Sequence, residues 1–228
     1  MTGNKSSFET VLEEVHAAEQ RAGRTPGSVR LMAVTKTVPA VRVNDAVRAG
    51  ITLLGENRVQ EFLGKKDEYL PDCEIHFIGT LQKNKVKYLI DTVDMIESVN
   101  SLELAMEISR QAQKKGRIMP VLLEINIGGE ESKTGMKPEN LLHILEKIQV
   151  LPGIQVEGLM AIPPVCNTEK EIRRYFQEMN KLFLDTRAKK LDNVNMNVLS
   201  MGMSGDFAVA IEEGSTEVRI GTHLFGSR

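Results

Sequence analysis

The sequence has little of what marks several large classes of protein. It contains no tryptophan and only 4% aromatic residues, too few for the aromatic platforms that stack nucleic-acid bases. Two cysteines in 228 residues do not make a disulfide scaffold. No apolar run approaches the roughly 18 residues of a membrane span, and the polar, acidic start is unlike a signal peptide. We therefore expect a reduced, cytoplasmic protein with no membrane partner.

The charge balance and the absence of linkers or low-complexity tracts further limit the classes of protein to which this chain could belong. Lys and Arg number 29 against 31 Asp and Glu, a net charge of −2, which argues against a strongly basic surface for nucleic acid or anionic membranes. The chain shows no linker, low-complexity tract or charge block. Its length suffices for a large hydrophobic core, and we expect a single domain over residues 1–228.

Short apolar segments alternate with helical patterns along the whole chain. A leading helix with Phe8, Val11, Leu12 and Val15 on one face precedes them. The predicted strands are 29–34, 52–55, 74–78, 95–99, 119–127, 155–160, 194–199 and 218–221. The predicted helices between and after them fall near 39–50, 59–63, 82–90, 102–115, 141–148, 172–183 and 205–213. Eight such units favour an α/β fold, a (β/α)8 TIM barrel with an additional N-terminal helix, over a doubly wound open sheet.

The carboxyl ends of the strands are where such barrels place their working residues. Lys36 follows the first strand, and alternation puts it on one face with Met32 and Val34. If that face is turned to the barrel axis, the amine stands at the mouth above an apolar floor, where burial would lower its pKa. A neutral amine can form a Schiff base with an aldehyde. The alternative is a lysine that extends into solvent at a strand end.

The loops after the seventh and eighth strands form the recurrent phosphate site of these barrels. The first, residues 199–207, offers the hydroxyls of Ser200 and Ser204, and Ser204 is also placed to cap the next helix. Asp206, expected in the first turn of that helix, would weaken the attraction for an anion. The second loop, residues 217–226, offers Arg219, Gly221 and Thr222. Together the two loops predict phosphate binding.

Other polar residues have weaker signals. Asn57 ends the second strand and either contacts a ligand or caps the following helix, and the cap is the better expectation. His76 is expected to be a satisfied core or rim histidine. The four histidines form no close pair of ligands and no Cys-x-x-Cys occurs, so we expect no metal site.

Six ordered segments give the chain a close resemblance to the pyridoxal phosphate homeostasis proteins, which are similar to the N-terminal barrel of alanine racemase. They are AVTKT (33–37), GENRVQE (55–61), HFIGTLQKNK (76–85), EGLMAI (157–162), LSMGMSGDF (199–207) and VRIGTHLFGSR (218–228). The matches run from about residue 8 to the end of the chain.

The resemblance implies a set of residues that bind pyridoxal 5′-phosphate. Lys36 matches the lysine that holds the cofactor as a Schiff base, and Asn57 matches a residue near its ring. Arg219 matches the arginine that meets the pyridine nitrogen. The matches to the phosphate-binding positions are Ser200, Gly221 and Thr222, with Met201 and Ser204 close by. One departure is visible: Ile75 and Thr80 stand where the family usually has Trp and His.

The resemblance also implies a protein that carries the cofactor in vitamin B6 homeostasis, by buffering or delivery, and does not turn over a substrate. Racemisation needs proton transfer on both faces of the substrate carbon. The sequence ends seven residues after Gly221, so we expect no second domain to supply the opposite base, and no tyrosine falls at a predicted strand end. We therefore predict no catalytic residues.

Two other functions stay open at this point. One is an amino-acid racemase or lyase that depends on pyridoxal phosphate, and the other is an interaction protein that senses the cofactor. Apo enzymes that use pyridoxal phosphate are candidate partners of a carrier. No exposed apolar helix face is evident, which favours a monomer.

Overall fold

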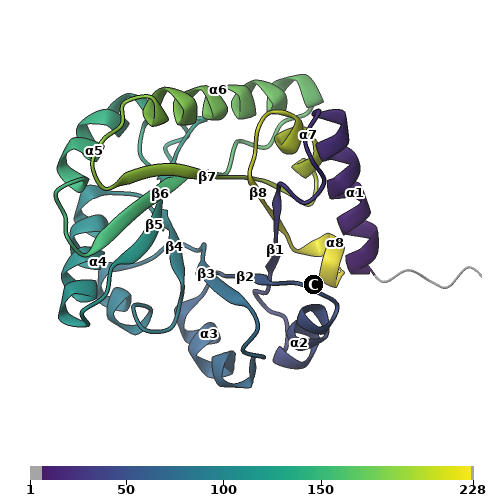
Figure 1. Ribbon diagram of the computed structural model, residues 1–228, viewed down its shortest axis with the longest axis horizontal. Coiled ribbons are helices and arrows are strands. Elements are labelled where there is room, and N and C mark those ends of the chain that lie inside the picture. The colour runs from purple at the N-terminus through teal and green to yellow at the C-terminus, as the bar shows by residue number, and fades with distance from the viewer. Residues whose placement is uncertain (1–6, 227–228) are drawn as a thin grey trace, which may run out of the picture.

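The computed structural model describes residues 7–226, which form a closed barrel of eight parallel strands (Figure 1). Each strand pairs with the next one along the chain, and the last pairs with the first. The strands are β1 (Arg30–Val34), β2 (Leu53–Glu56), β3 (Glu74–Phe77), β4 (Met95–Val99), β5 (Met119–Ile125), β6 (Ile154–Ala161), β7 (Val194–Met203) and β8 (Glu217–Ile220). The predicted TIM barrel is confirmed, and the open sheet is excluded because β1 and β8 are paired.

The helices form a ring outside the strands, and α1 lies beside α7 and α8 (Figure 1). Their bounds are α1 (Ser7–Arg21), α2 (Ala40–Arg48), α3 (Val59–Lys65), α4 (Leu102–Lys114), α5 (Leu141–Ile148), α6 (Glu169–Arg187), α7 (Phe207–Glu212) and α8 (Thr222–Phe225), with short 3-10 helices η1 (Lys66–Glu68), η2 (Lys83–Tyr88) and η3 (Pro138–Asn140). The additional N-terminal helix is confirmed. Within residues 7–226, no helix combines the length and the apolar character needed to cross a membrane.

One predicted helix is different in kind. Residues 82–90 were expected to be helical, and the structure forms the 3-10 helix η2 there. Val86 is the one buried residue of η2, while lysines occupy three of its six positions. The segment therefore lacks the apolar stripe of 3.6-residue period that stabilises an α-helix against a core.

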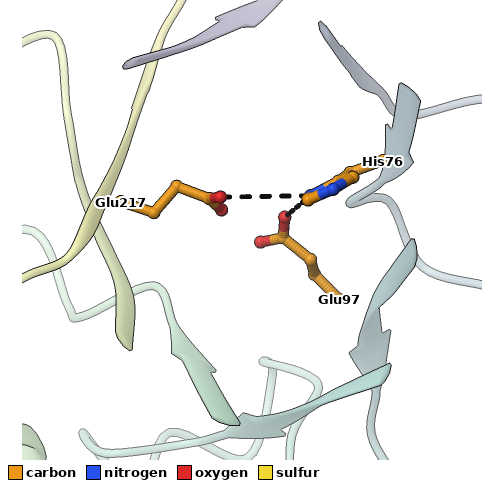
Figure 2. Close-up of side chains that lie close together, drawn as sticks. All are labelled: His76, Glu97 and Glu217. Carbon is orange, nitrogen blue, oxygen red and sulfur yellow. Dashed lines mark hydrogen bonds and ion pairs between the residues drawn. The ribbon is translucent and has the colours of Figure 1, made fainter. Parts of the chain in front are cut away.

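Strand alternation divides the core into an inner and an outer part. Apolar side chains between the strands and the helix ring form the larger part, which includes Phe62, Phe77 and Phe176. Inside the barrel, small clusters are formed by Met32, Val34, Leu53 and Ile78, and by Met95, Leu122 and Met160. Buried polar side chains also lie inside the barrel, among them His76, Glu97 and Glu217 (Figure 2).

Candidate functional site

Lys36 follows β1 at the carboxyl end of the barrel. Met32 and Val34 pack inside the barrel, whereas Ala33 packs in the outer core. The alternation predicted for this strand is therefore confirmed, and it leads to Lys36 two residues beyond Val34. The residue is exposed, however, so of the two alternatives considered for Lys36, the structure does not show the buried one. The strand ends at Val34, and the chain has already left the barrel wall where Lys36 stands.

The turn that carries Lys36 is held by two side chains of α3. Thr37 has a φ of 60°, a left-handed conformation that non-glycine residues rarely adopt. The Glu61 carboxylate accepts a hydrogen bond of 2.6 Å from the Thr37 amide. Lys65 donates to the Thr35 carbonyl at 2.9 Å and to Glu61 at 2.9 Å. These hydrogen bonds stabilise the turn and so offset the free-energy cost of the left-handed backbone conformation at Thr37.

The negative charge of Glu61 is stabilised by the same contacts that hold the turn. Burial alone would raise the pKa of the Glu61 carboxyl, but hydrogen bonds from Lys65 and the Thr37 amide, together with the positive charge of Lys65, lower the pKa below its usual value. Glu61 is therefore ionised wherever the turn is intact at neutral pH.

Asn57 lies beside Lys36 in the register of the sheet. Val34 pairs with Gly55, and Lys36 and Asn57 each follow two residues later. The expected helix cap is wrong, because Arg58 occupies the N-cap position of α3 and no side chain caps it. Instead, the Asn57 Oδ1 atom is buried and has no hydrogen-bond partner among residues 7–226. A buried amide oxygen without a partner is costly and marks a place where a ligand would restore the bond.

Arg219 is a buried cation on β8. Its side chain is 3% exposed, and it donates from Nη1 to the Ser200 hydroxyl at 2.7 Å and from Nη2 to the Ala161 carbonyl at 2.9 Å. A guanidinium has five N–H donors, so three have no acceptor among the described residues. Burial lowers the pKa of Arg219, and the Glu97 and Glu217 carboxyls act in the opposite direction.

Ser200 and Met201 lie apart from the other predicted phosphate contacts. The Ser200 hydroxyl is fully buried, accepts from Arg219 and donates to Glu97 Oε2 at 2.7 Å. The Met201 side chain packs in the outer core, on the far side of the sheet from Ser200. The hydroxyl of Ser200 is thus already used by two charged groups of the barrel interior.

Ser204 and Gly221 come together where the last two loops meet. The Gly221 amide donates to the Ser204 hydroxyl at 3.3 Å, and Thr222 follows as an exposed residue at the start of α8. The expected capping of α7 by Ser204 is wrong. Because β7 continues to Met203, the helix begins only at Phe207, and Asp206 takes the N-cap position without a capping bond. Asp206 instead accepts from the Met203 amide at 2.6 Å.

Three strands bring a histidine and two glutamates together inside the barrel (Figure 2). His76 Nδ1 lies 2.7 Å from Glu97 Oε1 and 4.0 Å from Glu217 Oε2. All three side chains are at most 1% exposed. Burial, and then the neighbouring Glu97, raise the pKa of Glu217 well above its usual value. His76 is a buried histidine with a partner, as predicted, but the sequence spacing gave no sign of the two glutamates.

The remaining predicted residues lie away from the barrel axis. Ile75 packs against the outer core, and Thr80 is exposed after β3. Of the tyrosines, Tyr69 follows η1, Tyr88 ends η2 and Tyr175 belongs to α6, so none of them follows a barrel strand. The Tyr69 hydroxyl donates to Glu56 at 2.5 Å, and burial, followed by this contact, raises its pKa far above the usual value.

A cavity of about 450 Å³ lies beside the loops after β6 and β7. Pro163, Val165 and Ile172 line one side, and Met203 and Asp206 line the other. Neither Lys36 nor Arg219 lines this cavity, so it is separate from the predicted site.

Comparison with known families gives one consistent result. The sequence profile of the alanine racemase N-terminal domain matches residues 11–228. A protein of Aquifex aeolicus named pyridoxal phosphate homeostasis protein is 47% identical over 220 residues, which cover 96% of this chain and 95% of that one. A protein of the same name from Escherichia coli is 36% identical over 222 residues, covering 96% and 94%.

Solved structures agree with the sequence comparison. PipY of Synechococcus elongatus, with pyridoxal phosphate (PLP) bound, is 35% identical with a TM-score of 0.82, covering 95% of this chain and all of that one. A protein of unknown function from Bifidobacterium adolescentis is 40% identical with a TM-score of 0.92, covering 96% and 93%. Alanine racemase from Corynebacterium glutamicum, at 17% identity and a TM-score of 0.70, covers 97% of this chain and 62% of its own and shares the fold.

Proposed function

Since the chain belongs to the family of pyridoxal phosphate homeostasis proteins, we propose that it binds pyridoxal 5′-phosphate at the mouth of its barrel and holds it reversibly on Lys36. We propose further that it does so without turning over a substrate, and that it acts in the cytoplasm as a buffer or delivery protein for the cofactor.

The observation that carries the proposal is a pair of groups with free hydrogen-bonding capacity on the two strands that flank β1. Asn57 Oδ1, which follows β2, is buried without a partner, and Arg219 on β8 has three N–H donors without an acceptor among the described residues. Asn57 is level with Lys36 in the register of the sheet, whereas Arg219 is level with Met32, deeper in the barrel. An amine, a cation and a lone acceptor fit the aldehyde and the polar ring atoms of this cofactor.

When bound, pyridoxal phosphate supplies an aldehyde that condenses reversibly with an amine. Lys36 provides that amine, and its turn is fixed by Glu61 and Lys65. As the resemblance implies, Arg219 would face the pyridine nitrogen. Being a cation, it would disfavour a proton there, so the ring would be a weaker electron sink than one paired with a carboxylate.

The proposed phosphate site is formed by the loops after β7 and β8. The Gly221 amide and the Ser204 hydroxyl already face each other at 3.3 Å, and Thr222 adds an exposed hydroxyl beside them. A phosphate would replace this long internal hydrogen bond with shorter, charge-assisted ones. Ser200 contributes indirectly, as the acceptor that orients Arg219.

Two features support binding without turnover. A racemase needs a second base opposite the lysine, and no tyrosine of the described chain follows a barrel strand. The Lys36 residue is exposed to solvent. Open access favours exchange of the cofactor with solution, or with apo enzymes that use it, over protected carbanion chemistry.

The test is the visible spectrum of the purified chain with PLP, recorded before and after borohydride. We expect a yellow protein whose colour is lost on reduction, with the reduced adduct mapped to Lys36 by peptide mass. Lys36→Ala should give no adduct, whereas Lys83→Ala, which removes an exposed lysine of η2, should behave as wild type. An adduct on another lysine would refute the assignment. Steady turnover of alanine or serine that is lost in Lys36→Ala would support a racemase or lyase instead.

A further inference from the structure

The cluster of His76, Glu97 and Glu217 inside the barrel lies outside the proposed cofactor site and has the donor set of a metal centre. One imidazole nitrogen and oxygens of two carboxylates all lie within 4.8 Å of one another. The donors come from β3, β4 and β8, and Figure 2 shows the three side chains pointing toward one another across the interior. Their backbones are fixed by the sheet, so the donors are held in place before any ion binds.

Glu217 is the residue of this cluster whose carboxyl group makes no hydrogen bond to the described residues. Its side chain is 0% exposed, and neither carboxylate oxygen has a hydrogen-bond partner among the described residues. Arg30 approaches Glu217 Oε2 only to 3.9 Å, which is too long for a hydrogen bond. A buried carboxyl group whose oxygens have no partner is costly unless something else satisfies them.

The other two side chains each have a partner on the side away from the centre of the cluster. His76 Nε2 lies 3.5 Å from Glu74 Oε2, an ion-pair distance rather than a hydrogen bond, and Nδ1 faces the two glutamates. Glu97 turns Oε1 to His76, and its Oε2 accepts from Ser200. This is the arrangement of protein metal sites, in which a carboxylate fixes the ligating histidine and a hydrogen bond fixes the ligating carboxylate.

From this geometry we propose that His76 Nδ1, Glu97 Oε1 and both carboxylate oxygens of Glu217 bind one divalent transition-metal ion, with Zn²⁺ as the probe. Around a zinc ion, donors from different residues lie about 3–3.5 Å apart, whereas the two oxygens of one chelating carboxylate are held closer by their shared carbon. The observed 2.7 Å between His76 and Glu97 must widen, and the 4.0 Å between His76 and Glu217 must shorten. A ligating imidazole nitrogen carries no proton and ligating carboxylates are ionised, so binding releases to solvent the protons that His76 Nδ1, Glu97 and Glu217 hold between them.

The chemistry of the donors decides the class of ion. An imidazole donor and only four protein donors disfavour Ca²⁺ and Mg²⁺, which prefer six or more oxygen ligands or retained waters. The site is enclosed, so the two oxygens of Glu217 complete the coordination without water. A closed site of this kind is structural, and the ion stabilises the barrel because it binds the folded chain only.

The experiment uses the full chain without pyridoxal phosphate, so its outcome is independent of the cofactor proposal. Because the donors are at most 1% exposed, the ion is loaded by refolding the chelator-stripped chain with Zn²⁺, followed by desalting and metal analysis. We expect about one zinc per chain in wild type and almost none in Glu217→Gln. Zinc should raise the unfolding temperature of wild type by several degrees and leave that of the variant unchanged.

The matched control is His143→Asn, which removes an exposed histidine that lies 4.0 Å from Glu146. This variant should retain as much zinc as wild type. If Glu217→Gln does not fold, Co²⁺ loaded into wild type gives the answer, since an enclosed four-coordinate site shows strong visible ligand-field bands. Wild type that retains no more zinc than Glu217→Gln, or that shows no such bands, would overturn the proposal and leave the cluster as a proton-sharing network.

Discussion

The amide of Thr37 donates to the carboxylate of Glu61 at 2.6 Å, and this bond connects the turn that carries Lys36 to α3. Lys65, one helical turn after Glu61, bonds to the same carboxylate and to the Thr35 carbonyl. The left-handed Thr37 is therefore held from both sides. The position of the proposed cofactor lysine depends on an ion pair that lies outside the barrel.

This ion pair makes the turn sensitive to acid. The pKa of Glu61 is lower in the folded chain than its ordinary value near 4.5, so its stabilisation is complete above that value and is lost as the pH falls through the lowered pKa. Glu61→Gln should reduce the free energy of unfolding at pH 7 by about 1 kcal/mol, since the carboxylate is partly solvated. Urea unfolding of both proteins, from neutral pH down to the acid range below 4.5, measures the difference.

The difference between wild type and Glu61→Gln should shrink at the acid end of that series. Glu178→Gln, at an exposed position paired with Arg174, serves as the control and should change stability very little. A difference that stays constant across the whole pH range would contradict the role of the Glu61 charge.

Gly79 is a second point where the site depends on close packing. A Cβ atom at this position would lie 2.0 Å from the Asn57 carbonyl oxygen, and the backbone there cannot move freely. Gly79→Ala should destabilise the fold by about 1–3 kcal/mol and weaken PLP binding by displacing Asn57. Gly64→Ala is the control, because a Cβ there meets nothing within 4 Å, and it should stabilise α3 by about 0.5–1 kcal/mol. Equal effects of both substitutions in chemical denaturation would show that the close approach has no role.

The phosphate contacts predict a difference between two forms of the vitamin. Ser204→Ala and Thr222→Val should each weaken PLP by about 0.5–1.5 kcal/mol, which is about two- to tenfold in the dissociation constant. Neither should change the affinity for pyridoxal, which lacks the phosphate. Absorbance titrations of both compounds provide the measurement. If pyridoxal binds the wild type as tightly as PLP does, the phosphate site is wrong.

Unlike Ser204→Ala and Thr222→Val, Ser200→Ala should weaken the binding of PLP and of pyridoxal alike. The substitution takes a partner from Arg219 and from Glu97, both buried, and should cost about 1–3 kcal/mol of stability. Because Arg219 is proposed to face the ring, PLP and pyridoxal should weaken together. A selective loss of PLP affinity would mean that the Ser200 hydroxyl contacts the phosphate directly, as the family resemblance implied.

The regular periodicity of the sequence was sufficient to predict the barrel. Residues 95–99 were predicted as a strand and form one with the same bounds, and all five positions are buried. The alternation around Met32 and Val34 likewise located Lys36 at the correct end of β1.

Features that depend on barrel closure could not be predicted in this way. Glu97 and Glu217 are 120 residues apart, and they meet His76 only because the strands curve into a closed sheet. The capping role assigned to Ser204 failed for a local reason: β7 extends four residues beyond the predicted end at Leu199, and Asp206 competes for the nearby amides. A short polar motif predicts a helix cap correctly only if the preceding strand ends before the motif begins.

The pairing of β1 with β8 has a consequence for the timing of synthesis. The amine that would form the covalent bond is translated well before the groups proposed to bind the phosphate, Ser204, Gly221 and Thr222. A growing polypeptide on the ribosome exposes Lys36 long before it can retain the vitamin, so capture has to wait until the ring closes.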